Sequence, residues 1–152
     1  MTINVHFLNG PNLNLLGQRE PDIYGAQTLK DIEGEVRRAA DAAGEAVDIS
    51  FMQSNIEGEL VDAIQAADRA GAAIVINPAA YTHTSVALHD ALKACTVPTV
   101  EIHLSQPAKR ESFRQRSLVA EAVTGTISGF GAQSYLLGLQ AALNLLNTPK
   151  DA

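Results

Sequence analysis

Cysteine is almost absent from this chain of 152 residues, which contains only Cys95. A single cysteine cannot form a disulfide within the chain, which is compatible with a reducing compartment. Long apolar runs are lacking too, since none approaches the length of about 18 residues that would cross a bilayer. Residues 1–8 lack the basic start of a signal peptide. We therefore expect a soluble, cytoplasmic protein that makes no use of a membrane.

Basic residues are also scarce. Lys and Arg total 11 against 17 for Asp and Glu, which gives a net charge of −6, and no run of basic residues offsets it. An acidic protein repels nucleic acid, so we expect no nucleic-acid partner. If the ligand is an anion, positive charge must be concentrated at one site. Disorder is excluded because 46% of the residues are hydrophobic and only 18% are charged.

Several motifs of cofactor chemistry are missing. The chain has no GxGxxG sequence and no P-loop, which leaves nucleotide binding with little support. It has no HExxH motif, and its one cysteine stands alone, so a catalytic metal site is not expected.

Strand-like and helix-like segments alternate along the chain, five of each. The strands are expected at 3–8, 46–53, 72–76, 97–103 and, weakly, 125–128. The helices are expected from Thr28 to Gly44 and at 57–70, 85–93, 108–116 and 132–146. This alternation predicts a parallel sheet with helices on both faces. A length near that of an average domain predicts a single domain, 1–152, with the flavodoxin-like doubly wound fold.

In such a fold, ligands bind beyond the carboxyl ends of the strands. Four polar segments are expected to meet there, at 9–25, 54–55, 77–85 and 103–107. The first belongs to a stretch without periodic pattern, 9–27, and loops of that length are usually functional lids or disordered. Within it, Arg19 could help to lower the pKa of the Tyr24 phenol towards that of a useful base. Taken alone, however, each is more often an ordinary loop tyrosine or a surface charge.

The segment after the expected buried strand 72–76 carries further candidates. Asn77 can offer a donor and an acceptor to a ligand, or it can form an Asx turn before Pro78. His83 could donate to a hydroxyl group, and Asp90 is expected about two turns further on the same helix. Taken alone, Asp90 is interpreted as a carboxylate on the surface of a helix.

Glu101 and His103 share one face of a strand because they are two residues apart. The carboxylate can orient the imidazole and favour its protonated form, which is that of a general acid. Alternatively, and with equal weight, His103 is a half-buried structural histidine that forms a hydrogen bond with its neighbour and has no catalytic role. The backbone N–H groups of Leu104 and Ser105 could hold an anion. Arg114, on the expected helix 108–116, could reach a ligand or remain in solvent.

Several ordered motifs carry a family resemblance. Residues 8–17, Leu-Asn-Gly-Pro-Asn-Leu-Asn-Leu-Leu-Gly, followed by Arg19 and Tyr24-Gly25, closely resemble the N-terminal signature of type II 3-dehydroquinate dehydratases. The match continues through 53–55, 77–85, 101–105, 129–131 and 134–135, and so covers nearly the whole chain. The resemblance implies a flavodoxin-like fold and the reversible anti elimination of water from 3-dehydroquinate, through an enolate and without a cofactor. The reaction belongs to the shikimate or quinate pathway.

The resemblance also implies roles for individual residues. Tyr24 would be the base, assisted by Arg19, while Asn12 would help to stabilise the enolate through a water. His103, paired with Glu101, would be the acid. The remaining residues would bind substrate, through the side chains of Asn77, His83, Asp90 and Arg114 and the backbone amides of Leu104 and Ser105. Family members commonly form homododecamers built as tetramers of trimers.

The chain departs from the family pattern at Ile56, His89 and Gln106, where His, Arg and Asn are frequent. These positions bear on local packing and trimer contacts more than on the reaction. The residues are also compatible with two other functions. One is a flavodoxin-like binding module for a small phosphate or flavin, and the other is a structural subunit whose long loop is ordered only by partners.

Overall fold

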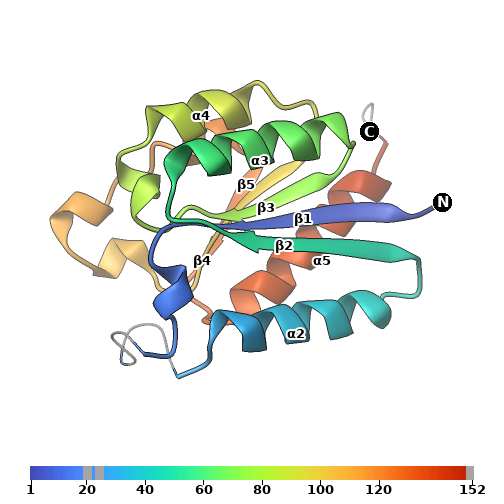
Figure 1. Ribbon diagram of the computed structural model, residues 1–152, viewed down its shortest axis with the longest axis horizontal. Coiled ribbons are helices and arrows are strands. Elements are labelled where there is room, and N and C mark those ends of the chain that lie inside the picture. Colours follow the sequence, from blue (N-terminus) through green and yellow to red (C-terminus); the bar gives the residue numbers. More distant parts are fainter. Residues whose placement is uncertain (19–21, 23–25, 150–152) are drawn as a thin grey trace.

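The centre of the fold is a parallel sheet of five strands in the order β2-β1-β3-β4-β5 (Figure 1). The computed structural model describes residues 1–18, 22 and 26–149. The strands are β1 (Ile3–Asn9), β2 (Val47–Gln53), β3 (Ala73–Asn77), β4 (Thr99–His103) and β5 (Gly125–Ser128). All five expected strands are confirmed, including the weak fifth one, and so is the flavodoxin-like order.

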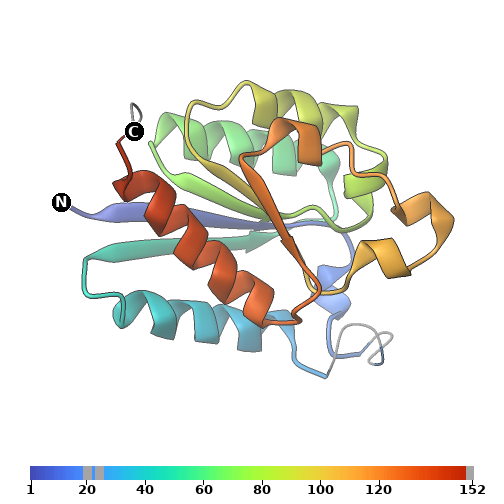
Figure 2. The same cartoon turned by 180° about the vertical axis from the view of Figure 1, so that it is seen from behind.

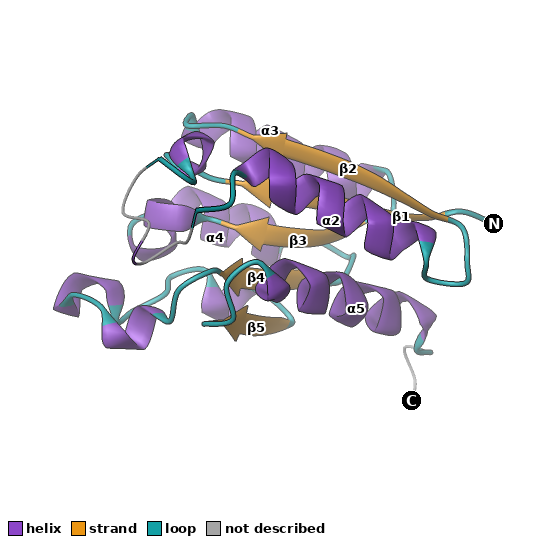
Figure 3. Cartoon of the chain, turned by 90° about the horizontal axis from the view of Figure 1, so that it is seen from below, coloured by secondary structure: helices purple, strands orange, loops and turns teal. Residues whose placement is uncertain are grey.

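Helices cover both faces of this sheet. Helices α2 (Leu29–Asp41) and α5 (Gln133–Asn147) lie on one face, and α3 (Glu57–Arg69) and α4 (Val86–Lys93) lie on the other (Figures 2 and 3). Thr28 begins α2 with a reciprocal capping box, because its hydroxyl accepts from the Asp31 N–H while the Asp31 carboxylate accepts from the Thr28 N–H. Among the described residues, no helix has the length and apolar character needed to cross a bilayer.

Two apolar cores result from the alternation of side chains along the strands. Val5 and Phe7 of β1 face the α2–α5 layer, whereas Leu8 faces the α3–α4 layer. All five residues of β3 are buried, as the continuous apolar run of 72–76 predicted for a central strand.

The chain reverses its winding direction at β1. It passes from β1 to β2 on one side and then to β3 on the other side of β1. The carboxyl ends of β1 and β3 therefore flank the crevice at which ligands bind in doubly wound sheets.

The prediction of a continuous helix over 108–116 is wrong. Two short 3-10 helices, Pro107–Lys109 and Ser112–Arg114, stand there instead. Arg110 interrupts the helical path with an extended backbone (φ −101°, ψ −166°). The amide of Gln115 donates to the carbonyls of Pro107 and Arg110, at 3.3 and 2.9 Å. The Arg110 carbonyl thus accepts from a side chain, whereas a continuous helix would have paired it with a backbone N–H, and the Pro107 carbonyl also accepts from the Arg110 N–H.

Gly138 brings α5 close to the sheet. A Cβ atom at this position would lie 2.9 Å from Cγ1 of Val75 and 3.0 Å from Cγ2 of Ile102, which are both buried. We expect Gly138→Ala to lower the free energy of unfolding by about 1–3 kcal/mol despite the better helix propensity of alanine, because the core becomes overpacked.

Gly58→Ala is the matched control, because Gly58 is exposed in α3 and a Cβ there would meet nothing within 4 Å. We expect denaturant titration to give this variant a free energy of unfolding equal to that of the wild type or up to about 1 kcal/mol higher. Equal stability of the two variants would contradict the close approach of α5.

Candidate active site

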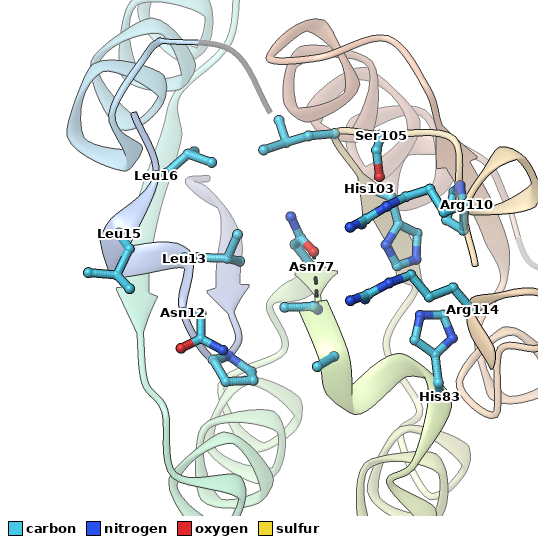
Figure 4. Close-up of a pocket in the computed structure, with 15 residues that line it drawn as sticks. Asn12, Leu13, Leu15, Leu16, Asn77, His83, His103, Ser105, Arg110 and Arg114 are labelled. Carbon is cyan, nitrogen blue, oxygen red and sulfur yellow. Dashed lines mark hydrogen bonds between the residues drawn. The ribbon is translucent and has the colours of Figure 1, made fainter. Parts of the chain in front are cut away.

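A pocket opens at the carboxyl edge of the sheet. Its lining comes from residues 11–16 after β1, 77–83 after β3, 103–107 after β4, and the excursion that carries Arg110 and Arg114. In Figure 4, Asn12 and the leucines lie on one side of the pocket and the histidines and arginines on the other, with Asn77 between them. Three of the four expected segments line the pocket. The fourth, 54–55, supports it from outside.

The wall after β1 depends on a close backbone crossing. The Gly10 N–H donates to the Asn77 carbonyl at 2.8 Å, and a Cβ on Gly10 would lie 2.5 Å from the Pro78 carbonyl oxygen. Asn12 follows with a positive φ of 69°. Its N–H donates to the side-chain oxygen of Asn55 at 2.9 Å. Asn55, just after the end of β2, therefore fixes the backbone from which Asn12 reaches the pocket.

Asn77 both forms a turn and lines the pocket. Its side-chain oxygen accepts from the Ala79 N–H at 3.2 Å, as in the Asx turn that the sequence left open. Its amide nitrogen donates to the Tyr135 hydroxyl at 3.0 Å. These two contacts fix the orientation of the amide, so its second N–H is the group left for a ligand.

Tyr135 connects Asn77 to the core. Its hydroxyl donates to the side-chain oxygen of Asn9 at 2.6 Å, and the Asn9 amide donates to the Met52 carbonyl at 2.9 Å. Burial raises the pKa of Tyr135 well above the ordinary value, and the hydrogen bond from Asn77 only partly opposes this. The phenol therefore stays neutral, and keeps the proton it donates to Asn9.

Glu101 and His103 meet at the end of β4, as their spacing predicted. His103 Nε2 lies 2.5 Å from the Glu101 carboxylate, and the two residues are 8% and 1% exposed. Because an ionised carboxylate can only accept, Nε2 carries the proton in this bond. His103 also lines the pocket, so Nδ1 is the ring nitrogen available for proton exchange with a ligand.

His83 lines the pocket beside this pair. Its Nδ1 lies 2.7 Å from the Arg116 carbonyl, which can only accept a hydrogen bond. Nδ1 is therefore protonated, and Nε2 is left for a ligand. His83 lies in the 3-10 helix Ala79–His83 rather than on α4 with Asp90, so the expectation of one shared helix is wrong.

Positive charge is concentrated in the pocket, as an acidic chain with an anionic ligand requires. Arg110 and Arg114 are 13% and 17% exposed, and both point into the pocket (Figure 4). Glu111 lies 3.7 Å from the first and 3.1 Å from the second. A hydrogen bond from its own backbone N–H, followed by the Arg114 charge, holds the pKa of Glu111 below its usual range. Among the described lining residues there is no Asp or Glu.

The other predicted site residues fall into three groups. Leu104 and Ser105 line the pocket, as expected. Asp90 is exposed on α4 and does not belong to the pocket lining of its own chain. Arg19 and Tyr24 lie outside the described residues, so their roles stay predictions.

Two residues with contacts at the site, Arg110 and Ser117, were not predicted from the sequence. Arg110 lines the pocket, and Ser117 donates to Glu101. In the sequence, nothing distinguished Arg110 from the other charged residues of the helix that was wrongly expected at 108–116. No local pattern marks Ser117, whose contact joins residues from different elements.

The chain is similar to known proteins over nearly its whole length. The family model described as dehydroquinase class II matches residues 3–143. The chain belongs to this family. Two curated relatives are the 3-dehydroquinate dehydratases of Maricaulis maris and Sinorhizobium medicae. The first is 56% identical over 146 residues, covering 96% of this chain and 99% of the relative. The second is 54% identical over 150 residues, covering 99% and 100%.

Solved structures of type II dehydroquinases have the same fold. That from Butyrivibrio crossotus has a TM-score of 0.90 at 35% identity and covers 93% of this chain and 98% of its own. That from Propionibacterium acnes has a TM-score of 0.88 at 38% identity and covers 94% and 98%. The family resemblance drawn from the sequence is thus confirmed.

The buried contacts of Tyr135 generate a stability prediction. Tyr135→Phe leaves the Asn9 oxygen and one Asn77 N–H without the hydroxyl, and both side chains are buried. We expect the free energy of unfolding to fall by about 1–3 kcal/mol, measured by denaturant titration.

Tyr81→Phe makes the same chemical change where the hydroxyl donates to the exposed Asn55 carbonyl, and should cost less than about 1 kcal/mol. An equal or smaller loss in Tyr135→Phe would mean that the buried network does not hold Asn77.

Proposed function

We propose that the chain is a type II 3-dehydroquinate dehydratase that removes water from 3-dehydroquinate by reversible anti elimination. The observation that carries the mechanism is the buried Glu101–His103 pair opening onto a pocket with two arginines. Loss of a hydroxide-like leaving group needs a proton donor, and a histidine held by a carboxylate is suited to that task. Family membership supplies the substrate through the names of the curated relatives.

The acid half of the reaction is assigned to described residues. His103, protonated on Nδ1, donates that proton to the leaving hydroxyl at C1, while Glu101 stabilises the imidazolium through Nε2. The carboxylate of the substrate binds to the backbone amides of Leu104 and Ser105, next to positive charge from Arg114. Asn77 and His83 hold substrate hydroxyls with the N–H and Nε2 groups that their other contacts leave available.

The base half is assigned to the segment that follows β1. The Arg19 guanidinium stabilises the Tyr24 phenolate, which removes a proton from C2 and so becomes the neutral phenol. An enolate forms next, and a water held by Asn12 stabilises its charge. An anti elimination needs the base and the acid on opposite faces of the ring. Asn12 and His103 lie on opposite sides of the pocket, which supports this division of roles (Figure 4).

Side chains carry out both proton transfers of this scheme, so we propose that the reaction uses neither a metal nor an organic cofactor. The pathway is that of shikimate, which leads to chorismate and the aromatic amino acids, or that of quinate, and we place the enzyme in the cytoplasm.

Asp90 requires a second chain if it binds substrate. It is exposed on α4 and lies outside the pocket lining of its own subunit. We propose that the chain assembles as a homododecamer, a tetramer of trimers, in which Asp90 approaches the pocket of a neighbouring subunit. Analytical ultracentrifugation of the purified protein tests the number of subunits.

The assigned roles predict the behaviour of two variants. Both His103→Ala and Tyr24→Phe should lower kcat by about 10²–10⁴-fold, because each removes a group that transfers a proton in the reaction. The conjugated enone of the product absorbs ultraviolet light and the substrate does not, so absorbance follows the turnover directly.

Circular dichroism should show both variants folded. Wild-type turnover in His103→Ala would refute the acid assignment, and wild-type turnover in Tyr24→Phe would refute the base assignment. If the wild type itself leaves 3-dehydroquinate unchanged, the proposed reaction is wrong.

A further inference from the structure

Glu101 has a second side-chain partner besides His103. The Ser117 hydroxyl oxygen lies 3.2 Å from Oε1 and 3.1 Å from Oε2 of Glu101, so it spans the whole carboxylate. Glu101 is 1% exposed, and its carboxylate must therefore find partners within the protein. Ser117 supplies one of them from a segment 16 residues further along the chain.

The hydrogen bonds around Ser117 fix the direction of its proton. The Ala120 N–H donates to the Ser117 oxygen at 2.9 Å, so the hydroxyl is an acceptor on that side. Its one proton is left for Glu101, which accepts in its ionised form. This bond constrains the last torsion of the glutamate side chain, which has only a broad intrinsic preference. The plane of the carboxylate, and hence the direction of its bond to His103, depends on Ser117.

The backbone around Ser117 is fixed on both sides. The Arg116 carbonyl faces His83 Nδ1 at 2.7 Å, and the Leu118 N–H donates to the Thr82 carbonyl at 2.8 Å. The Leu118 carbonyl in turn faces His89 Nδ1 at 2.6 Å. Ser117 is thus held against β4 by the segment after β3 and by α4. Such anchoring gives a hydroxyl group the fixed position that proton-transfer geometry demands.

We infer that Ser117 is a positioning residue for the acid half of the reaction, acting through the Glu101 carboxylate to align His103. This inference rests on the proposed role of His103 as the acid. Ser117 does not belong to the pocket lining, so it acts on the substrate only through this pair. Removal of its hydroxyl slows proton donation and leaves the abstraction of the C2 proton by the base unaffected.

Isotope effects separate these two halves. Ser117→Ala should lower kcat about tenfold, as expected for loss of a hydrogen bond to a charged group, with KM changed less than about twofold. The solvent deuterium isotope effect on kcat should rise, because proton donation becomes more rate-limiting. The isotope effect of 3-dehydroquinate deuterated at C2 should fall. A merely structural loss of active protein would change neither isotope effect.

Three further variants complete the test. Ser117→Thr keeps a hydroxyl and should restore most of kcat and both isotope effects. Ser112→Ala removes an exposed hydroxyl from the same excursion and should match the wild type. If circular dichroism shows Ser117→Ala unfolded, Ser117→Cys replaces it. The thiol is a weak donor of similar shape, so the isotope effects should move in the same directions.

Two results would overturn the inference. One is wild-type kcat in Ser117→Ala, and the other is a lower kcat with both isotope effects unchanged. His103→Ala, measured alongside, separates this failure from that of the proposed mechanism. If His103→Ala is nearly inactive and Ser117→Ala is normal, the inference about Ser117 alone is wrong. If His103→Ala is fully active, the acid assignment fails and the inference fails with it.

Discussion

The buried carboxylate of Glu101 is the constraint on which the architecture of the site depends. A charge that is 1% exposed is strongly destabilising unless hydrogen bonds and an opposite charge compensate it. His103 provides one partner from the same strand, and Ser117 provides the other from a distant segment. That segment must return to β4 after the excursion that carries Arg110 and Arg114. The need to satisfy Glu101 therefore helps to hold in place the turns that bring both arginines to the pocket.

A related constraint acts across the sheet. The hydroxyl of Tyr135 on α5 joins Asn9 at the end of β1 to Asn77 at the end of β3. These two strands flank the point where the winding of the sheet reverses. The same buried contacts that stabilise this crevice orient the Asn77 amide at the pocket, so the stability of the fold and the geometry of the pocket depend on one network.

The distribution of charge explains how an acidic protein can attract an acidic substrate. The chain has a net charge of −6, yet the pocket has two mostly buried arginines and, among its described lining residues, no acidic side chain. Because both guanidinium groups are partly buried, their charges act more strongly on an anion in the pocket than they would in bulk water. Repulsion at longer range from the rest of the surface is screened by salt.

Much of the fold was predictable because it follows from local patterns. The apolar run before Asn77 predicted a central strand, and the two-residue spacing of Glu101 and His103 correctly predicted their contact. The helix expected at 108–116 is interrupted at the extended backbone of Arg110, whose carbonyl accepts from the Gln115 side chain, a contact that no local pattern marks. Ser117 was beyond prediction for another reason: its role depends on the return of the chain to β4, which no local pattern encodes.

The most direct test of whether this protein dehydrates 3-dehydroquinate is the absorbance of the product enone, recorded with the wild-type protein and 3-dehydroquinate. Two treatments make it decisive: EDTA to remove metal ions, and borohydride to trap any imine between a lysine and the substrate. We expect a rise in absorbance that survives both treatments, because proton transfers by side chains are sufficient for the proposed reaction. No rise from folded protein, or a rise abolished by either treatment, would contradict it.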